Sequence, residues 1–234
     1  MGEVKLLAGS IGVLENWFDK LYMDEVVERF GNKFDANLDS DECPKDWGPG
    51  WAQRNGVTYQ KNPKRWDQSF NLLDYGSLEH DIHYFRNHID HGAQLYFQKL
   101  LEGTGVPMNL AESPRRSVST CIKIQRTPPG GGFNSPHYEQ GPTEDVSRRY
   151  AVWMLYLNDV AHGGTTSFPL QGLEFEPKAG TLVVWPAAYT HVHHGNPPEK
   201  DCWKYIATGW YQYPATVEED DERTRYGDAE EGSD

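Results

Sequence analysis

Apolar residues in the N-terminal half of the chain recur at spacings of three and four, the period of an α-helix with one buried face. Two such stretches lie at residues 18–30 and 78–100, and glycines follow them at Gly31 and Gly103. Glycine just beyond the last periodic position is a common helix stop. We therefore predict two helices that support a larger structure.

From residue 117 onward the pattern changes to short runs rich in β-branched and aromatic residues. Glycine- and proline-rich clusters at residues 128–132 and 161–164 have the composition of tight turns. Strands are predicted at residues 118–125, 151–157, 174–177, 181–185 and 205–213. Several short strands at this spacing indicate an all-β sandwich or barrel rather than alternating β-α units.

Between the two helices, residues 32–71 are rich in Asp, Pro, Gly and Trp and show no sustained period. We expect mostly loop here, with at most an edge strand. A long irregular segment in a compact domain is often a lid or a substrate loop. The alternative is an ordered surface excursion anchored by Trp47, Trp51 and Trp66.

The length of 234 residues fits one sizeable globular domain. Within it we expect a helical support and loop region at residues 1–116, a core at 117–214 and an acidic disordered tail at 215–234. Residues 217–234 hold nine acidic side chains against two arginines, a composition typical of disorder. The net charge of −13 disfavours nucleic acid as a partner.

The cysteines, Cys43, Cys121 and Cys202, are odd in number and lack metal-ligand spacing, which argues against a disulfide framework. No apolar run is long enough to span a bilayer, and the sequence does not start like a signal peptide. We therefore expect a cytoplasmic protein without a membrane partner. No pattern in the sequence indicates an oligomeric state.

The most informative residues are His137 and Glu139. On a strand, positions i and i+2 point to the same side, so both can reach one metal while Tyr138 faces away. A second histidine from the cluster at residues 191–194 would complete a set of two histidines and one carboxylate, which suits non-heme iron(II) with open coordination positions.

An ordered set of motifs surrounds these residues. They are Ile-Gln-Arg-Thr-Pro-Pro-Gly-Gly-Gly-Phe at 124–133, His-Tyr-Glu at 137–139, Tyr-Leu-Asn at 156–158, Gly-Gly-Thr-Thr-Ser-Phe-Pro at 163–169, Pro-Lys-Ala-Gly at 177–180, His-His-Gly at 193–195 and Lys-Tyr-Ile-Ala-Thr-Gly-Trp at 204–210. Together they resemble the catalytic core of 2-oxoglutarate- and iron(II)-dependent dioxygenases of the prolyl 4-hydroxylase type. The resemblance implies an α+β, mainly β fold: a double-stranded β-helix, or jelly roll, with the N-terminal helices on one sheet.

In such enzymes the first His and the acid of His-x-Asp/Glu, together with a later His in a His-x-Gly context, bind iron. Here these are His137, Glu139 and His193. Most relatives have Asp at the acid position, so the extra methylene of Glu139 must be absorbed by the backbone or the rotamer. His194 and His191 remain alternatives to His193. Spacing to the downstream lysine favours His194, whereas the His-x-Gly context favours His193.

The resemblance also implies a cosubstrate site. Lys204 stands where a basic residue pairs with the C5 carboxylate of 2-oxoglutarate, and Tyr156 stands where a tyrosine often hydrogen-bonds the same carboxylate. Thr166 lies in the Gly-Gly-x-Thr turn near the site, first as a structural residue and also as a candidate cofactor contact. Fe(II) and 2-oxoglutarate are the expected cofactor and cosubstrate, with ascorbate as a candidate reductant.

The implied reaction is hydroxylation of an unactivated carbon with succinate and carbon dioxide as coproducts. A prolyl or other residue of a protein or peptide is the favoured substrate, and a free amino acid or small metabolite is the alternative. A catalytically silent jelly-roll binding module is the alternative from another class. Candidate substrate contacts are Arg126, Arg148, Arg149, Trp153 and the segment 32–71.

Overall fold

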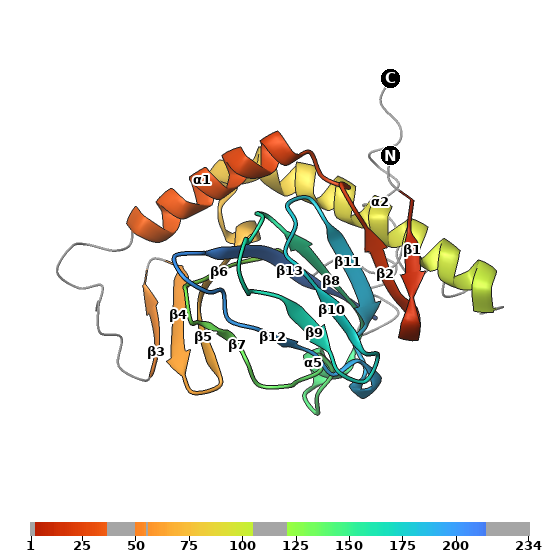
Figure 1. Cartoon of the computed structure of the whole chain (residues 1–234). Coiled ribbons are helices and arrows are strands. Elements are labelled where there is room, and N and C mark those ends of the chain that lie inside the picture. Colours follow the sequence, from red (N-terminus) through yellow and green to blue (C-terminus); the bar gives the residue numbers. More distant parts are fainter. Residues whose placement is uncertain (1–2, 37–49, 55, 105–120, 214–234) are drawn as a thin grey trace, which may run out of the picture.

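The computed structural model of the protein describes residues 3–36, 50–54, 56–104 and 121–213 (Figure 1). Within these ranges the helices are α1 (Lys20–Ala36), α2 (Glu79–Thr104) and the short α5 (Glu144–Ser147). The strands are β1 (Lys5–Leu7), β2 (Ile11–Leu14), β3 (Gly50–Arg54), β4 (Val57–Asn62), β5 (Arg65–Asn71), β6 (Lys123–Thr127), β7 (Gly132–Phe133), β8 (Arg149–Tyr156), β9 (Thr166–Phe168), β10 (Leu173–Phe175), β11 (Leu182–Pro186), β12 (His194–Gly195) and β13 (Lys204–Gln212).

Two antiparallel sheets make up the β structure of the described residues. The major sheet has ten strands in the order β1-β2-β11-β8-β13-β6-β5-β4-β3, with β7 also paired to β5. The minor sheet has the order β10-β9-β12. Helices α1 and α2 run across one face of the major sheet, while the minor sheet lies against the other face (Figure 1). This is the predicted jelly roll with helices covering one sheet.

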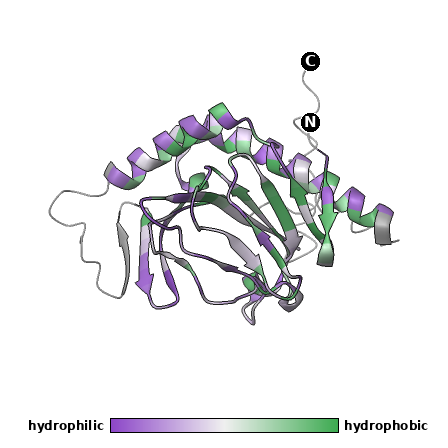
Figure 2. Cartoon of the chain, in the orientation of Figure 1, coloured by the Kyte–Doolittle hydropathy of each residue, from purple (hydrophilic) through white to green (hydrophobic). Residues whose placement is uncertain are grey.

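Strand β8 shows why the core forms on both faces of the major sheet. Trp153 and Leu155 join the apolar cluster under the helices, whereas Met154 and Tyr156 join the cluster between the sheets. Successive side chains of a strand point to opposite faces, so a strand that is buried on both sides is apolar throughout. Figure 2 shows the same continuous hydrophobic character along β2 and β11, which pair in the same sheet.

The first helix is longer than its sequence pattern indicates. It continues through Gly31 to Ala36 instead of ending near Phe30, so the predicted stop is wrong. Phe30 and Phe34 are both fully buried, which extends the apolar stripe past the glycine. Packing on the sheet therefore outweighs the modest helix penalty of one glycine. The second helix, α2, confirms the prediction for residues 78–100 and continues slightly further.

The prediction of mostly loop for residues 32–71 is wrong in its described part. Strands β3, β4 and β5 form an antiparallel meander that extends one edge of the major sheet. The missed signal is the Asn-Gly dipeptide at 55–56, a preferred two-residue hairpin turn, directly between β3 and β4. Asn62 then makes the next turn, because its side-chain oxygen accepts hydrogen bonds from the amides of Lys64 and Arg65.

Four of the five predicted C-terminal strands correspond closely to β8, β10, β11 and β13. The fifth, at 118–125, is present as β6 but lies further along, at Lys123–Thr127. Strands β1 and β2, which extend the opposite edge of the sheet from β3, were not predicted. The expected acidic tail at 215–234 and the proposed anchor Trp47 lie outside the described residues.

Helices of the described segments lack the combination of length and apolar composition that crossing a membrane requires.

Candidate metal centre

The two histidines nearest to Glu139 are held together by the backbone. The amide of His137 donates to the carbonyl of His193 at 3.0 Å, and the amide of His193 donates back to the carbonyl of His137 at 2.9 Å. This is an isolated antiparallel bridge, a hydrogen-bonded pair of directly opposite residues. Two segments that are far apart in the sequence thus bring the imidazole rings to a centroid separation of 4.5 Å.

Each imidazole is oriented by a backbone carbonyl. The Nδ1 atom of His137 lies 2.9 Å from the carbonyl oxygen of Ser135, and Nδ1 of His193 lies 2.9 Å from that of His191. Because a carbonyl oxygen only accepts, both Nδ1 atoms carry a proton, and both Nε2 atoms are directed toward Glu139. A carbonyl partner on the far nitrogen is the usual way to fix the tautomer of a metal-binding histidine.

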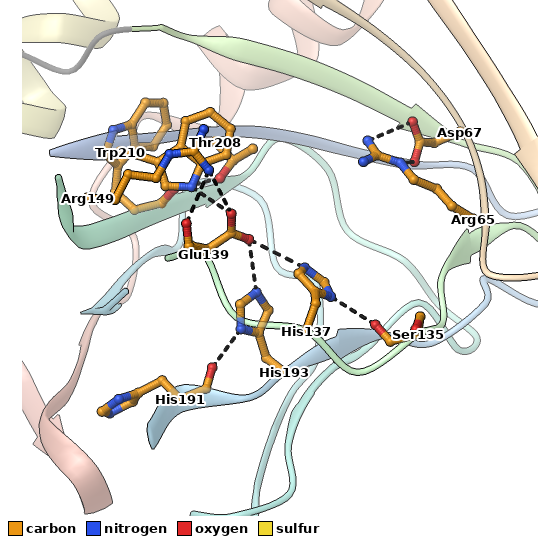
Figure 3. A network of polar contacts seen from close by, with 11 residues as sticks. Arg65, Asp67, Ser135, His137, Glu139, Arg149, His191, His193, Thr208 and Trp210 are labelled. Carbon is orange, nitrogen blue, oxygen red and sulfur yellow. Dashed lines mark hydrogen bonds and ion pairs between the residues drawn. The ribbon is translucent and has the colours of Figure 1, made fainter. Parts of the chain in front are cut away.

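Glu139 completes a three-residue cluster with its Oε1 atom. This oxygen lies 3.4 Å from Nε2 of His137 and 3.4 Å from Nε2 of His193. The candidate ligand atoms of the three residues all lie within 4.8 Å of one another. Figure 3 shows the three side chains converging. Tyr138, which lies between His137 and Glu139 in the sequence, is 46% exposed.

The second carboxylate oxygen of Glu139 is held from the other side. Its Oε2 atom accepts a hydrogen bond from the indole nitrogen of Trp210 at 2.9 Å and lies 3.3 Å from the guanidinium of Arg149. Arg149 in turn stacks over the Trp210 ring at 3.8 Å (Figure 3). Burial alone would raise the pKa of Glu139, but contacts with the imidazoles of His137 and His193 lower it well below its usual range. The carboxylate is therefore ionised.

The structure separates the three neighbouring histidines that the sequence left as alternatives. Only His193 joins the cluster with His137 and Glu139 among the described residues. His191 points away, with Nε2 on the carbonyl of Gly9 and Nδ1 on the hydroxyl of Thr190 (Figure 3). His194 lies on β12 and is not part of the cavity wall.

The cluster opens onto a cavity of about 280 Å³ between the two sheets. Its wall includes His137, Glu139 and His193 at one end and Thr166 and Lys204 at the other. Met154, Trp185 and Ile206 supply apolar wall between them. A cavity whose wall combines apolar side chains with convergent polar and charged groups has the form of a small-molecule site.

Lys204 is buried at the far end of this cavity, where it is only 5% exposed. Its ammonium nitrogen lies 3.3 Å from the hydroxyl of Thr166, which also accepts a hydrogen bond from the hydroxyl of Tyr156 at 2.9 Å. The three predicted cosubstrate residues thus form one cluster. Burial lowers the pKa of Lys204 to about 7. A lysine in such a place is costly unless an anion accompanies it.

Of the predicted substrate contacts, Arg149 lines the cavity. Trp153 is fully buried on the helix side of the sheet, and Arg126 points to the same side, where it binds Asp35 of α1. Arg148 pairs with Asp145 outside the cavity. Strand alternation accounts for Arg126 and Trp153, whereas Arg149 lies at the start of β8, where the pairing with β13 shifts register.

Two cations of the cavity wall were missed. Lys123 alternates with the apolar Ile124 along β6, so it faces the cavity together with Gln125 and Thr127. This period-2 pattern was a readable signal. Arg65 belongs to the segment 32–71, which the sequence indicates as a candidate substrate contact only as a whole.

The donor set fits the implied metal. Two imidazole Nε2 atoms and one ionised carboxylate oxygen face a common point, and no described residue other than these competes for it. Such a set with open positions is typical of iron(II) oxygenases. These side chains can therefore hold a divalent iron and leave room for ligands from the cavity.

Comparisons with known proteins agree with this geometry. Residues 122–212 match the family model described as the 2OG-Fe(II) oxygenase superfamily. The chain is 36% identical over 77 residues to prolyl 4-hydroxylase subunit alpha-1 of Gallus gallus, an alignment that covers 29% of this chain and 15% of that protein. The chain thus spans only a small fraction of the curated relatives that it matches.

Solved structures of prolyl hydroxylases share the fold. A viral collagen prolyl hydroxylase of Paramecium Bursaria Chlorella virus-1, in a 2OG complex, matches with a TM-score of 0.53 and 17% identity over 87% of this chain and 96% of its own. A Trichoplax adhaerens prolyl hydroxylase, in complex with a hypoxia inducible factor peptide, matches with a TM-score of 0.59 and 16% identity over 93% and 87%. Residues 122–212 are therefore similar to the 2OG-Fe(II) oxygenase superfamily, and the described chain shares its fold with solved prolyl hydroxylases.

Proposed function

We propose that this protein is an iron(II)- and 2-oxoglutarate-dependent oxygenase that hydroxylates an unactivated carbon, with a prolyl residue of a peptide or protein as the favoured substrate. One observation carries the proposal. The cluster of His137, Glu139 and His193 and the buried Lys204 occupy opposite ends of one cavity. We also propose the cytoplasm as its location, on the sequence pattern alone.

In the proposed reaction 2-oxoglutarate, dioxygen and a C–H bond give succinate, carbon dioxide and a C–OH group. One oxygen atom enters the succinate and the other enters the product. Bound iron supplies the site at which dioxygen is activated. The chain's own residues bind and orient the reactants.

Each cluster of the cavity has a separate task in this proposal. His137, Glu139 and His193 hold the metal, and their backbone partners fix the ring orientations before it binds. Lys204 binds the distal carboxylate of 2-oxoglutarate, and Thr166 and Tyr156 orient the ammonium group. The apolar side chains of Met154 and similar residues limit the entry of water.

Support for a peptidyl proline comes from the relatives. The matched proteins are named prolyl hydroxylases, and one solved structure contains a peptide fragment. These names describe those proteins. For this chain they make proline-containing peptides the first compounds to test.

The first experiment examines cofactor binding without turnover. Protein prepared without oxygen receives iron(II) and then 2-oxoglutarate, and the weak visible metal-to-ligand charge-transfer band is recorded. The band should appear in the wild type and in His191→Ala and His194→Ala, and it should be lost in His193→Ala. Absence of the band in folded wild-type protein would refute the proposal and favour a silent binding module.

The second experiment identifies the reaction. Under air, with and without ascorbate, succinate formation is measured together with the mass of added peptides and amino acids. An added oxygen atom on a proline-containing peptide would support the prolyl assignment. An added oxygen only on a free amino acid would replace that assignment with the small-molecule alternative.

A further inference from the structure

The cavity is strongly cationic although the chain is acidic. Arg65, Lys123, Arg149 and Lys204 line it, and Glu139 is the only carboxylate side chain in its wall among the described residues. The whole chain has a formal net charge of −13. A local excess of positive charge in such a chain indicates that the cavity takes anionic ligands.

The two arginines already have partners. Arg65 forms a two-point ion pair with Asp67, a residue that is 1% exposed, and Arg149 contacts Glu139. The two lysines differ from them. Neither Lys123 nor Lys204 forms an ion pair with any residue that the structure describes. In the proposed function, Lys204 pairs with the distal carboxylate of 2-oxoglutarate, and no carboxylate pairs with Lys123.

Lys123 belongs to the metal end of the cavity. On paired strands β6 and β13, Thr127 lies opposite Lys204, whereas Lys123 lies opposite Thr208. The two lysines are thus four residues apart along the strands, or roughly 13 Å. Burial lowers the pKa of Lys123, as does the neighbouring Arg65, while Asp67, Cys121 and Glu139 raise it. The candidate metal ligand Glu139 is thus one of the neighbours of Lys123, and Lys204 is not among them.

One cosubstrate molecule cannot serve both lysines. A five-carbon dicarboxylate measures roughly 5 Å between its two carboxyl carbons. With its distal carboxylate at Lys204 and its other end at the metal, it has no anionic group left for Lys123. The remaining cation faces the space between the metal cluster and β5, where Arg65 stacks over Phe133 at 4.8 Å.

We propose, on the basis of the proposed function, that Lys123 binds a carboxylate of the substrate and that the hydroxylated carbon lies close to that group. Arg65 is the second cation of this subsite. It is held in place by Asp67 and by the ring of Phe133, which itself stacks on His137 at 3.7 Å. The carboxylate belongs either to a free amino or imino acid or to an acidic residue or C-terminus of a peptide.

The experiment uses matched pairs of probes that differ only in the carboxylate. L-proline is compared with L-prolinamide, and a proline-glutamate peptide with its proline-glutamine counterpart, both blocked at their ends. Binding to the anaerobic iron and 2-oxoglutarate complex is followed by perturbation of the charge-transfer band, and turnover is followed by kcat/KM. We expect the carboxylate member of at least one pair to be preferred by about tenfold or more.

Variants of Lys123 test the assignment. Lys123→Met and Lys123→Gln should reduce the preference to about one, whereas Lys123→Arg should retain most of it. Affinity for 2-oxoglutarate should change less than about twofold in all three. The pair that responds identifies the source of the carboxylate.

The outcomes separate this inference from the proposed function. Absence of the charge-transfer band in folded wild-type protein refutes the proposed function. A normal band without a carboxylate preference in either pair, or a preference that Lys123→Met and Lys123→Gln retain, overturns the inference alone. A large loss of 2-oxoglutarate affinity in the Lys123 variants also overturns it, because Lys123 would then serve the cosubstrate.

Discussion

The two faces of the major sheet share one backbone and differ in chemistry. On β13, Tyr205, Ala207 and Tyr211 pack under the helices, while Lys204 and Thr208 face the cavity. The helix-side face is almost entirely apolar, and the cavity side places cations and hydroxyls among apolar residues. The comparison teaches that adjacent residues of a strand can have separate tasks, so that substitutions at neighbouring positions should affect either stability or ligand binding.

The largest effect is expected on the helix face. Phe85 of α2 is fully buried and packs between Phe18 and Phe30, with ring centroids 5.6 and 6.3 Å away. Phe85→Ala should lower the free energy of unfolding by about 3–5 kcal/mol. Urea denaturation followed by circular dichroism measures this. The protein that remains folded should keep the charge-transfer band. Loss of the band in folded protein would contradict the idea that the helix-side face affects stability and the cavity face affects ligand binding.

The next effect belongs to the cavity face. Lys204→Met removes a buried cation whose proposed partner is the distal carboxylate of 2-oxoglutarate. Affinity for 2-oxoglutarate should fall by about 2–5 kcal/mol, while iron binding and folding are retained. Anaerobic titration of the band gives the affinity. The exposed Lys178 offers the control, and Lys178→Met should leave the affinity unchanged. Equal affinities of Lys204→Met and Lys178→Met for 2-oxoglutarate would contradict the assignment of Lys204 to the cosubstrate site.

A smaller effect is expected from the residues that orient the metal ligand. Trp210 donates to the Oε2 atom of Glu139, and Trp210→Phe deletes that donor while it keeps most of the ring. Loss of such a partner typically weakens metal binding about 10- to 100-fold. Iron(II) titration of the variant measures it, with the partly exposed Trp203→Phe as control. An unchanged iron affinity would show that Arg149 alone positions the carboxylate.

The smallest effect concerns pH. Burial lowers the pKa of Lys204 to about 7, so above that pH the free protein must take up a proton when the anion binds. The groups that contact this ammonium are Thr166 and the Tyr156 ring, and neither carries a charge. Affinity for 2-oxoglutarate should therefore fall by up to about tenfold per pH unit above pH 7. Lys204→Met should lose that dependence.

The same pKa has an opposite consequence for the stability of the metal-free protein. The unfolded chain, with an ordinary lysine, binds more protons than the folded chain between about pH 7 and 10. The contribution of Lys204 to stability therefore improves as pH rises through that window. Thermal unfolding of wild type and Lys204→Met at several pH values isolates it, and a parallel pH dependence in both proteins would contradict the lowered pKa.

Much of the fold was predictable where one period dominates. The apolar stripe on α2 and the apolar run of β8 are long enough to be recognised as a helix and a strand from the sequence. Strand β1 has only three residues. Strands β4 and β5 place only Val57, Tyr59 and Phe70 in the helix-side core, and most of their other residues are polar, as the hydrophilic colouring of β4 in Figure 2 illustrates. Their strand structure depends on joining the major sheet, which occurs through the pairing of β5 with the distant β6 and of β2 with β11, and a local pattern does not contain these pairings.

The candidate site was predicted mainly through ordered motifs. His137, Glu139 and Lys204 stood out by type and spacing, and the structure brings each to the cavity. The choice between His193 and its neighbours depends on register, because His193 is the residue that pairs directly with His137. Lys123 could have been recognised only with the knowledge that β6 has one face on the cavity.

The reciprocal backbone pairing of His137 with His193 makes the metal site a link between two segments that are far apart in the sequence. It joins the segment after β7 with the segment just before β12, and the chain between the two histidines forms β8 to β11. Iron bound as proposed would link the same two segments a second time through the side chains, and because it binds the folded site it would oppose local opening there. Occupancy of the site should therefore be recorded as slower exchange of the two amide protons of His137 and His193.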